Sequence, residues 1–199
     1  MTLAIGITGG IGSGKSTVCE LFKILGIPVF EADLASKKLI NTNSEIKNGL
    51  IQLFGSNIYN TDKTINRKML ANLIFNDNLL LEQVNELIHP VVRTEYLNWL
   101  KQQNTAYIIH EAAILFESGF YKMMDYTILV TAPEEIRIER VIKRDNALPE
   151  IVRRRMEKQW LDEEKLKLAS IELINDNKNL IIPKILEIDN KLKIHGKIW

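Results

Sequence analysis

The chain has 199 residues, 46% of them hydrophobic, which is enough to bury one substantial core. Lys and Arg total 26 against 25 Asp and Glu, so the sequence lacks the overall basic charge that drives non-specific nucleic-acid binding. Cys19 is the one cysteine, which excludes an internal disulfide and is typical of a reducing compartment such as the cytoplasm. Residues 1–10 have no basic start and no run of about 18 apolar residues occurs, so neither export nor membrane spanning is predicted.

The first predicted elements form the start of a βαβ unit. Leu3–Thr8 is a short apolar strand, a glycine-rich turn follows, and Lys15–Leu25 has a helical pattern. Gly26-Ile27-Pro28 ends that helix, and Val29-Phe30 lead as a second strand into the acidic segment 31–33. This order predicts an acidic side chain near the carboxyl end of the second strand.

The rest of the chain alternates helices with three further short strands. Residues 34–103 have a mostly helical pattern, with breaks at 41–44 and 55–62 and a predicted helix boundary at His89-Pro90. The other predicted elements are strands at Tyr107–Ile109, Tyr126–Val130 and Leu173-Ile174, a helix at Pro133–Arg144, a break at Asn146–Pro149, and a second helical stretch at Glu150–Ser170. Alternation of this kind predicts a parallel sheet with a helical insertion after the second strand.

The turn after the first strand is a complete phosphate-binding motif. Residues 9–16 read Gly-Gly-Ile-Gly-Ser-Gly-Lys-Ser, which matches glycine, four residues, glycine, lysine and serine. Glycines let successive backbone N–H groups turn inward, and the following helix directs its N-terminal dipole at the same anion. In such a loop Lys15 serves the β- and γ-phosphates and Ser16 can ligate Mg²⁺. A turn that merely joins strand to helix is the weaker interpretation.

Nucleotide switches, motors and kinases share this loop, so other residues must separate them. The sequence has no Asn-Lys-x-Asp element for reading guanine and is short for a motor, which favours a kinase of a small substrate. Another small-molecule or nucleoside kinase, or a nucleotide-dependent regulatory module, remains as an alternative.

Asp33 is the candidate general base. Ligands of open α/β sheets bind outside the carboxyl ends of the strands, where this carboxylate can accept a hydroxyl proton. The competing interpretation is an N-cap for a helix beginning at Leu34. Glu31 is a weaker candidate for the same role.

Arginines gather in the late helices. Arg137, Arg140 and Arg144 are spaced to share one helix face, and residues 153–155 add three more after the break. A lid of arginines can close over a triphosphate and neutralise charge during transfer. Because Glu134, Glu135 and Glu139 are interleaved, a salt-bridged surface is the open alternative.

These residues together resemble the dephospho-CoA kinase family over nearly the whole chain. The motifs that carry the resemblance are, in chain order, residues 6–17, Ala32-Asp33, Phe54-Gly55, Asn66-Arg67, His89-Pro90, Leu115-Phe116-Glu117, Arg140, Arg144-Asp145, Gln159 and Asn175. The resemblance implies an enzyme that uses Mg²⁺ and ATP to phosphorylate the ribose 3′-hydroxyl of dephospho-CoA. It implies a three-layer α/β/α P-loop fold with a five-stranded parallel sheet, a helical substrate-binding insertion and a lid.

Site residues follow from the resemblance position by position. Asp33, Lys15 and Arg140 are the implied catalytic residues, and Ser16 is the implied Mg²⁺ ligand. The implied nucleotide-binding residues are Gly10, Ile11, Gly12, Ser13, Gly14, Lys15, Ser16, Thr17, Arg144 and Asn175. The implied acceptor-binding residues are Thr8, Asp33, Arg67, His89 and Glu117.

Three parts of the chain are expected on the same basis. Residues 1–33, 104–135 and 171–199 would form the nucleotide-binding core, 34–103 the insertion that binds dephospho-CoA, and 136–170 the arginine-bearing lid. A cytoplasmic enzyme is expected, without a nucleic-acid or membrane partner, as a monomer with an oligomer left open.

The sequence departs from the family pattern at a few positions. Glu31 stands where the family usually has Asp, Asn66 where Asp is common, and Ala113 where a proline is usual. Ala169-Ser170 replaces an Ala-Asp pair. None of these changes removes a proposed catalytic group.

Overall fold

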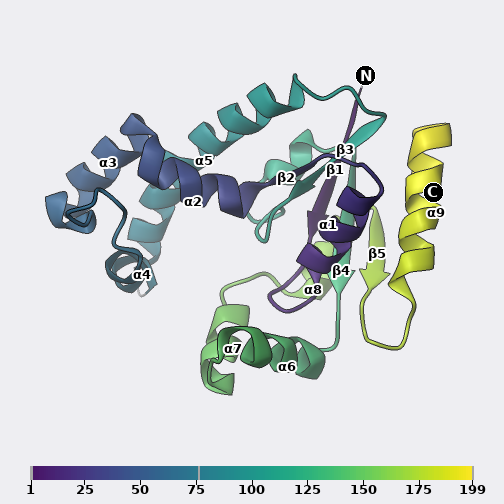
Figure 1. Ribbon diagram of the computed structural model, residues 1–199. Helices are drawn as coiled ribbons and strands as arrows, with labels where there is room; N and C mark the ends of the chain where they lie inside the picture. The colour runs from purple at the N-terminus through teal and green to yellow at the C-terminus, as the bar shows by residue number, and fades with distance from the viewer. Residues whose placement is uncertain (1, 76, 199) are drawn as a thin grey trace. The chain divides into compact units, whose positions relative to one another are not determined.

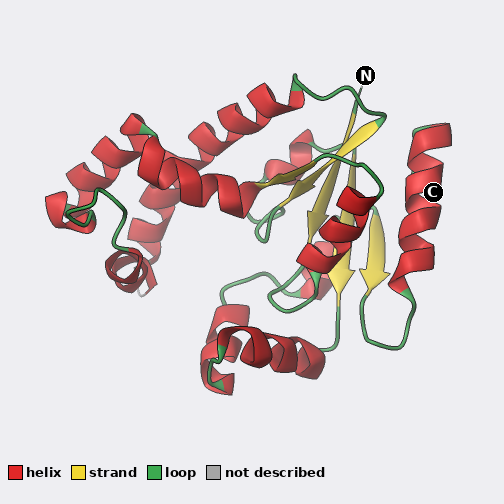
Figure 2. Ribbon diagram, viewed as in Figure 1, coloured by secondary structure: helices red, strands yellow, loops and turns green. Residues whose placement is uncertain are grey.

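The computed structural model describes residues 2–75 and 77–198 (Figure 1). The chain forms two compact units, one made of Met1–Glu31 with Gln103–Trp199 and the other of Ala32–Gln102. The first unit holds the sheet and the second is helical (Figure 2). None of the helices in the described parts of the chain combines the length and the apolar character needed to cross a membrane.

The sheet of the first unit has five parallel strands in the order β2-β3-β1-β4-β5, which confirms the predicted sheet. The strands are β1 (Leu3–Thr8), β2 (Val29–Glu31), β3 (Tyr107–Glu111), β4 (Tyr126–Thr131) and β5 (Ile171–Ile174). The strands β1, β3 and β4 are buried almost throughout, because a parallel sheet covered on both faces needs continuous apolar runs. In this strand order β1, which leads into the phosphate-binding motif, is the central strand of the sheet.

Helices α1 (Lys15–Ile24) and α9 (Ile181–His195) pack together against the sheet. Their apolar faces share one core with β1, β3 and β4, in which Val18 and Phe22 of α1 meet Ile185 and Ile188 of α9. The other helices of this unit are η2 (Phe120–Met123), α6 (Glu134–Asp145), α7 (Pro149–Met156) and α8 (Asp162–Leu166).

The single helical stretch predicted for 150–170 is wrong, because the chain leaves the helix after Met156 and begins a new one at Asp162. Side-chain carboxylates stabilise the N-terminus of this second helix. The Leu161 N–H donates to Glu164 Oε2 at 3.2 Å. The first turn contains Asp162, Glu163 and Glu164. Negative charge at that end is stabilised by the helix dipole. The acidic triplet in the sequence was the signal for this second helix start.

The second unit consists of helices. They are α2 (Ala32–Thr42), α3 (Ser44–Phe54), η1 (Ser56–Ile58), α4 (Arg67–Phe75) and α5 (Asn78–Leu100), and the predicted breaks at 41–44 and 55–62 are confirmed. The predicted boundary at His89-Pro90 is wrong, because α5 continues through Pro90. Burial of Val84, Ile88, Val92 and Tyr96 along one face holds the helix together across the hydrogen bond that proline cannot donate.

The burial of His110 predicts that the stability of the first unit depends on pH. Its ring is fully buried in β3 and stacks between Phe30 and Phe120, with centroid distances of 5.4 and 4.6 Å. Burial lowers the pKa of His110 from 6.5 to about 3. Between these two pH values the unfolded chain binds a proton at His110 that the native protein does not. The free energy of unfolding should therefore fall with pH below 6.5, by about 1.4 kcal/mol per pH unit from this group.

The measurement is urea unfolding between pH 6.5 and pH 5. We expect the variant His110→Phe, which keeps a ring in the stack, to lose this part of the slope. The exposed His195 supplies the control, since His195→Gln should leave the slope unchanged. An equal slope in wild type and His110→Phe would contradict the assignment.

Candidate functional site

The loop between β1 and α1 has the backbone conformation that a phosphate cradle needs. Gly12 and Gly14 lie at φ +79° and +95°, in the left-handed region that side chains disfavour. A Cβ at Gly12 would lie 2.4 Å from the Arg137 carbonyl oxygen, and one at Gly14 would lie 2.1 Å from Asn175 Nδ2. These two positions therefore require glycine both for conformation and for space.

Lys15 begins α1, and its ammonium reaches back to the first residue of the loop. Its Nζ donates to the Gly9 carbonyl oxygen at 3.0 Å and lies 3.8 Å from Glu111 Oε1, both side chains being about 11% exposed. Glu111 ends β3, directly beside β1, with which it pairs at Ile7. Glu111 was not among the predicted site residues, although it follows an apolar strand pattern, and its position as an acid at a strand end was the available signal.

Arg140 and Asn175 hold the loop from the side of α6 and β5. Arg140 Nη1 donates to the carbonyl oxygens of Gly12 and Ser13 at 3.3 and 3.2 Å, and its Nη2 donates to the Asn175 carbonyl oxygen at 2.9 Å. Asn175 Nδ2 also donates to the Ser13 carbonyl oxygen at 2.9 Å. The structure thus brings two of the predicted residues directly onto the phosphate loop, where they contact its outward carbonyl groups.

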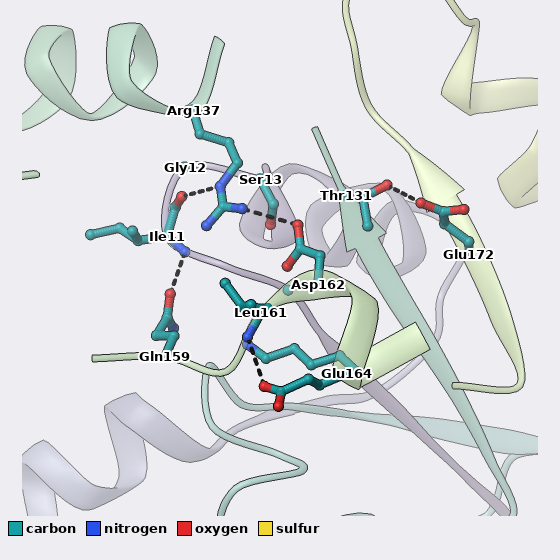
Figure 3. Close-up of polar contacts among 12 residues, drawn as sticks. Ile11, Gly12, Ser13, Thr131, Arg137, Gln159, Leu161, Asp162, Glu164 and Glu172 are labelled. Carbon is teal, nitrogen blue, oxygen red and sulfur yellow. Dashed lines mark hydrogen bonds and ion pairs between the residues drawn. The ribbon is translucent and has the colours of Figure 1, made fainter. Parts of the chain in front are cut away.

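Arg137 and Gln159 contact the loop at Ile11; Arg137 was expected only as one of the lid arginines, and Gln159 had no predicted site role. Arg137 Nε donates to the Ile11 carbonyl oxygen at 3.0 Å, and the Ile11 N–H donates to Gln159 Oε1 at 2.8 Å (Figure 3). Arg137 is 9% exposed and its Nη1 donates to Asp162 Oδ2 at 3.0 Å. Both polar groups of one loop residue are therefore held by the segment that follows β4.

Three other arginines of α6 and α7 lie in surface ion pairs. Arg144 Nε donates to Asp145 Oδ1 at 2.7 Å, and Arg155 Nη1 donates to Asp145 Oδ2 at 3.0 Å. The Arg144 guanidinium lowers the pKa of Asp145, and Asp145 raises the pKa of Arg144. Arg153 pairs with Glu134. In this structure Arg144, Arg153 and Arg155 therefore form surface salt bridges, as the alternative to a phosphate-binding role predicted.

Asp33 lies in the first turn of α2, because this helix begins at Ala32 and not at Leu34. The N-cap interpretation of Asp33 is therefore wrong. Its side chain is exposed, two residues after the last residue of β2, whereas Glu31 Oε1 accepts a hydrogen bond from Lys23 Nζ at 2.5 Å. Asp33 is the less constrained of the two acids.

The predicted acceptor-binding residues fall in both units. Thr8 is buried at the end of β1 and donates to the Ala113 carbonyl oxygen at 3.4 Å. Glu117 Oε1 accepts the Trp160 N–H at 3.2 Å and lies 3.0 Å from Nζ of the fully buried Lys165.

Two further members of that set, Arg67 and His89, belong to the helical unit. Arg67 is exposed at the start of α4, and His89 is half-buried within α5. Burial, helped by the charge of Arg93, lowers the pKa of His89, so its imidazole is neutral at pH 7.

The residues of the loop fit a triphosphate with its Mg²⁺. The hydroxyl of Ser13 is fully buried and has no hydrogen-bond partner among the described residues. Ser16 and Thr17 expose their hydroxyls in the first turn of α1, where helix dipole and unpaired N–H groups favour an anion. Over residues 2–75 and 77–198, no group of three or more His, Cys, Asp or Glu side chains is arranged to hold a metal ion.

A central parallel strand, a glycine loop with Lys15 and Ser16, and a following helix define a P-loop nucleotide-binding protein. A shikimate kinase from Acinetobacter baumannii has the same fold, with a TM-score of 0.51 and 16% identity over 100% of this chain and 97% of that chain. The family model described as dephospho-CoA kinase matches residues 3–180. The chain belongs to the dephospho-CoA kinase family.

Individual relatives agree with this assignment. The dephospho-CoA kinase of Bacteroides fragilis is 42% identical over 94% of this chain and 92% of its own length, and that of Porphyromonas gingivalis is 39% identical with the same coverage. A crystal structure from Thermus thermophilus superposes with a TM-score of 0.84 at 32% identity, covering 94% of this chain and 95% of that chain. The dephospho-CoA kinase of Campylobacter jejuni gives 0.72 at 27% identity, covering 99% and 100%.

Proposed function

We propose that the protein is a dephospho-CoA kinase, which transfers the γ-phosphoryl group of ATP to the ribose 3′-hydroxyl of dephospho-CoA and releases CoA and ADP. This is the last step of coenzyme A synthesis. The observation that carries the proposal is the match to the dephospho-CoA kinase family over residues 3–180, in a chain whose phosphate loop is complete.

The donor side is built from the loop and its supports. Backbone N–H groups of the loop and of the first turn of α1 bind the phosphates together with the ammonium of Lys15, apart from the N–H groups of Ile11 and Ser13, which donate to Gln159 Oε1 and to the Gly10 carbonyl oxygen. Arg140 and Asn175 keep the loop in shape through its carbonyl groups. Ser16 would ligate Mg²⁺, which neutralises charge on the β- and γ-phosphates when bound. The carboxylate of Glu111 limits the positions open to the Lys15 ammonium.

The acceptor side begins at the carboxyl end of β2. Glu31 is in register with Glu111, the residue that faces Lys15, and Asp33 follows Glu31 by two residues. This short distance along the chain supports Asp33 as the base that orients the 3′-hydroxyl and accepts its proton as the new P–O bond forms. Thr8, Arg67, His89 and Glu117 complete the proposed acceptor set.

The proposed division of labour assigns the nucleotide to residues 1–33, 104–135 and 171–199, the acceptor to 34–103, and a lid to 136–170. Arg144 would exchange its partner Asp145 for a phosphate or the adenine when the lid closes. We propose that the enzyme works as a monomer in the cytoplasm.

The experiment is a comparison of acceptors. ADP release from Mg·ATP by the purified protein is measured alone and with dephospho-CoA, shikimate or adenosine at equal concentration. We expect release to rise at least tenfold above the acceptor-free rate with dephospho-CoA only. Stimulation by another acceptor, or none by dephospho-CoA while ATP still binds, would refute the substrate assignment and leave the nucleotide site intact.

A further inference from the structure

We propose that Gln159 is a positioning residue for the phosphate loop, which it holds through the peptide group of Ile11. The proposal rests on nucleotide binding at the loop, which is part of the proposed function, and does not depend on the identity of the acceptor. Gln159 lies between α7 and α8, three positions before the first residue of α8. It is far from the loop in the sequence but contacts it in the folded chain.

Side chains bind both backbone polar groups of Ile11. The Ile11 N–H donates to Gln159 Oε1 at 2.8 Å, and its carbonyl oxygen accepts from Arg137 Nε at 3.0 Å. A peptide group whose N–H and C=O are both fixed by side chains cannot rotate without breaking two hydrogen bonds. Figure 3 shows the two partners reaching Ile11 from different segments.

Arg137 also packs on the neighbouring glycines. A Cβ at Gly10 would lie 2.0 Å from Arg137 Nη2, and a Cβ at Gly12 would lie 2.9 Å from Arg137 Cα. Arg137 therefore lies close against the loop and leaves no space for a side chain at Gly10 or Gly12. Asp162 neutralises it at 3.0 Å.

The segment that carries Gln159 is itself anchored at both ends. We call residues 159–165 the strap. Beyond Gln159, the Trp160 N–H donates to Glu117 Oε1 at 3.2 Å, Asp162 pairs with Arg137 at 3.0 Å, and Lys165 pairs with Glu117 at 3.0 Å. The strap thus connects the phosphate loop after β1 with the turn after β3.

This arrangement has a chemical consequence. Phosphoryl transfer depends on positioning, and the loop N–H groups bind phosphate only in one backbone conformation. Removal of the Gln159 acceptor frees the Ile11 peptide, so part of the binding free energy must then be spent on ordering the loop. Because the loop holds the nucleotide in the ground state and the transition state alike, the loss should fall on KM for ATP more than on kcat.

A double-mutant cycle on the full-length protein tests the proposal. Gln159→Met removes the acceptor and keeps the side-chain length, and Ile11→Pro removes the donor. Affinity for the magnesium complex of adenosine 5′-(β,γ-imido)triphosphate is measured by calorimetry. We expect Gln159→Met to weaken binding roughly 3- to 10-fold in the wild-type background and less than about 2-fold in the Ile11→Pro background. Equal losses in both backgrounds would overturn the proposal.

A second measurement covers the case in which Ile11→Pro does not fold. Amide exchange of the Ile11 N–H is followed in wild type, Gln159→Met and the control Gln102→Met, which alters an exposed glutamine after α5. We expect faster exchange and a raised KM for ATP only in Gln159→Met, with kcat within about twofold of wild type. Faster exchange with unchanged affinity and KM would show a contact without a positioning role and would contradict the proposal.

The outcome is separable from that of the proposed function. If dephospho-CoA fails to stimulate ADP release while the nucleotide analogue still binds, the substrate assignment falls and the cycle at Ile11 can still be measured. If the cycle shows no coupling in an active dephospho-CoA kinase, only the role of Gln159 falls.

Discussion

Asp33→Asn should lower kcat for phosphorylation of dephospho-CoA by about 10² to 10⁴, because a positioned general base contributes acceleration of that order. Asparagine keeps the shape of the side chain and cannot accept the hydroxyl proton. ATP affinity should change little, since the phosphate loop and Lys15 are untouched. Single-turnover rates at saturating ATP and dephospho-CoA measure the chemical step directly, and titration with a non-hydrolysable analogue measures the affinity.

Glu31→Gln is the matched control, because Glu31 is the neighbouring acid and is bound to Lys23. Its chemical rate should stay within a few-fold of wild type. A wild-type rate in Asp33→Asn would contradict the role of Asp33 as the base. A larger loss in Glu31→Gln than in Asp33→Asn would instead assign that role to Glu31.

Lys165→Met should lower the free energy of unfolding by about 3 to 5 kcal/mol, the typical cost of removing one partner from a buried ion pair. The Lys165 side chain is fully buried and its Nζ lies 3.0 Å from Glu117 Oε1, a pairing of charges without an aligned hydrogen bond among the described residues. Glu117 Oε2 is also buried without such a partner. Loss of the ammonium leaves the Glu117 carboxylate in a low-dielectric site, which is the source of the cost.

Two further variants separate this cause from general damage. Lys167→Met changes an exposed lysine in the same segment and should alter stability by less than about 0.5 kcal/mol. Lys165→Met combined with Glu117→Gln removes the uncompensated charge and should recover part of the loss. Denaturant unfolding at pH 7 gives all four values. A double variant less stable than Lys165→Met alone would contradict the ion-pair account.

The sequence was sufficient for those parts of the fold that depend on local pattern. The phosphate loop can be recognised from the sequence because its glycines, lysine and serine have separate physical roles at fixed spacing. The strands β1, β3 and β4 can be recognised because they are continuous apolar runs, as expected for a parallel sheet covered on both faces. The strand order could not be read in the same way, since it depends on which strands pair across long separations.

The errors have a common physical origin in tertiary packing. Pro90 lies inside α5 because a continuous buried face outweighs one missing hydrogen bond. The stretch 150–170 breaks because Gln159 and the Trp160 N–H are committed to partners on the phosphate loop and at Glu117. Neither commitment is visible in the periodicity of the sequence.

The supports of the site were the hardest to foresee. Glu111, Arg137 and Lys165 lie far in sequence from the groups they contact, so spacing rules do not connect them. Arg140 and Asn175 were named through family resemblance, and the contacts of both with loop carbonyl groups emerge only from the fold. The roles assigned to the acceptor residues stay predictions.

The most direct test of the account is the product of the reaction. The purified protein is incubated with Mg·ATP and dephospho-CoA, and the acceptor is analysed by mass spectrometry and phosphorus NMR. The account predicts one added phosphoryl group, located on the ribose 3′-hydroxyl, with one ADP formed for each CoA. An unmodified acceptor, or a phosphoryl group at another position, would contradict it.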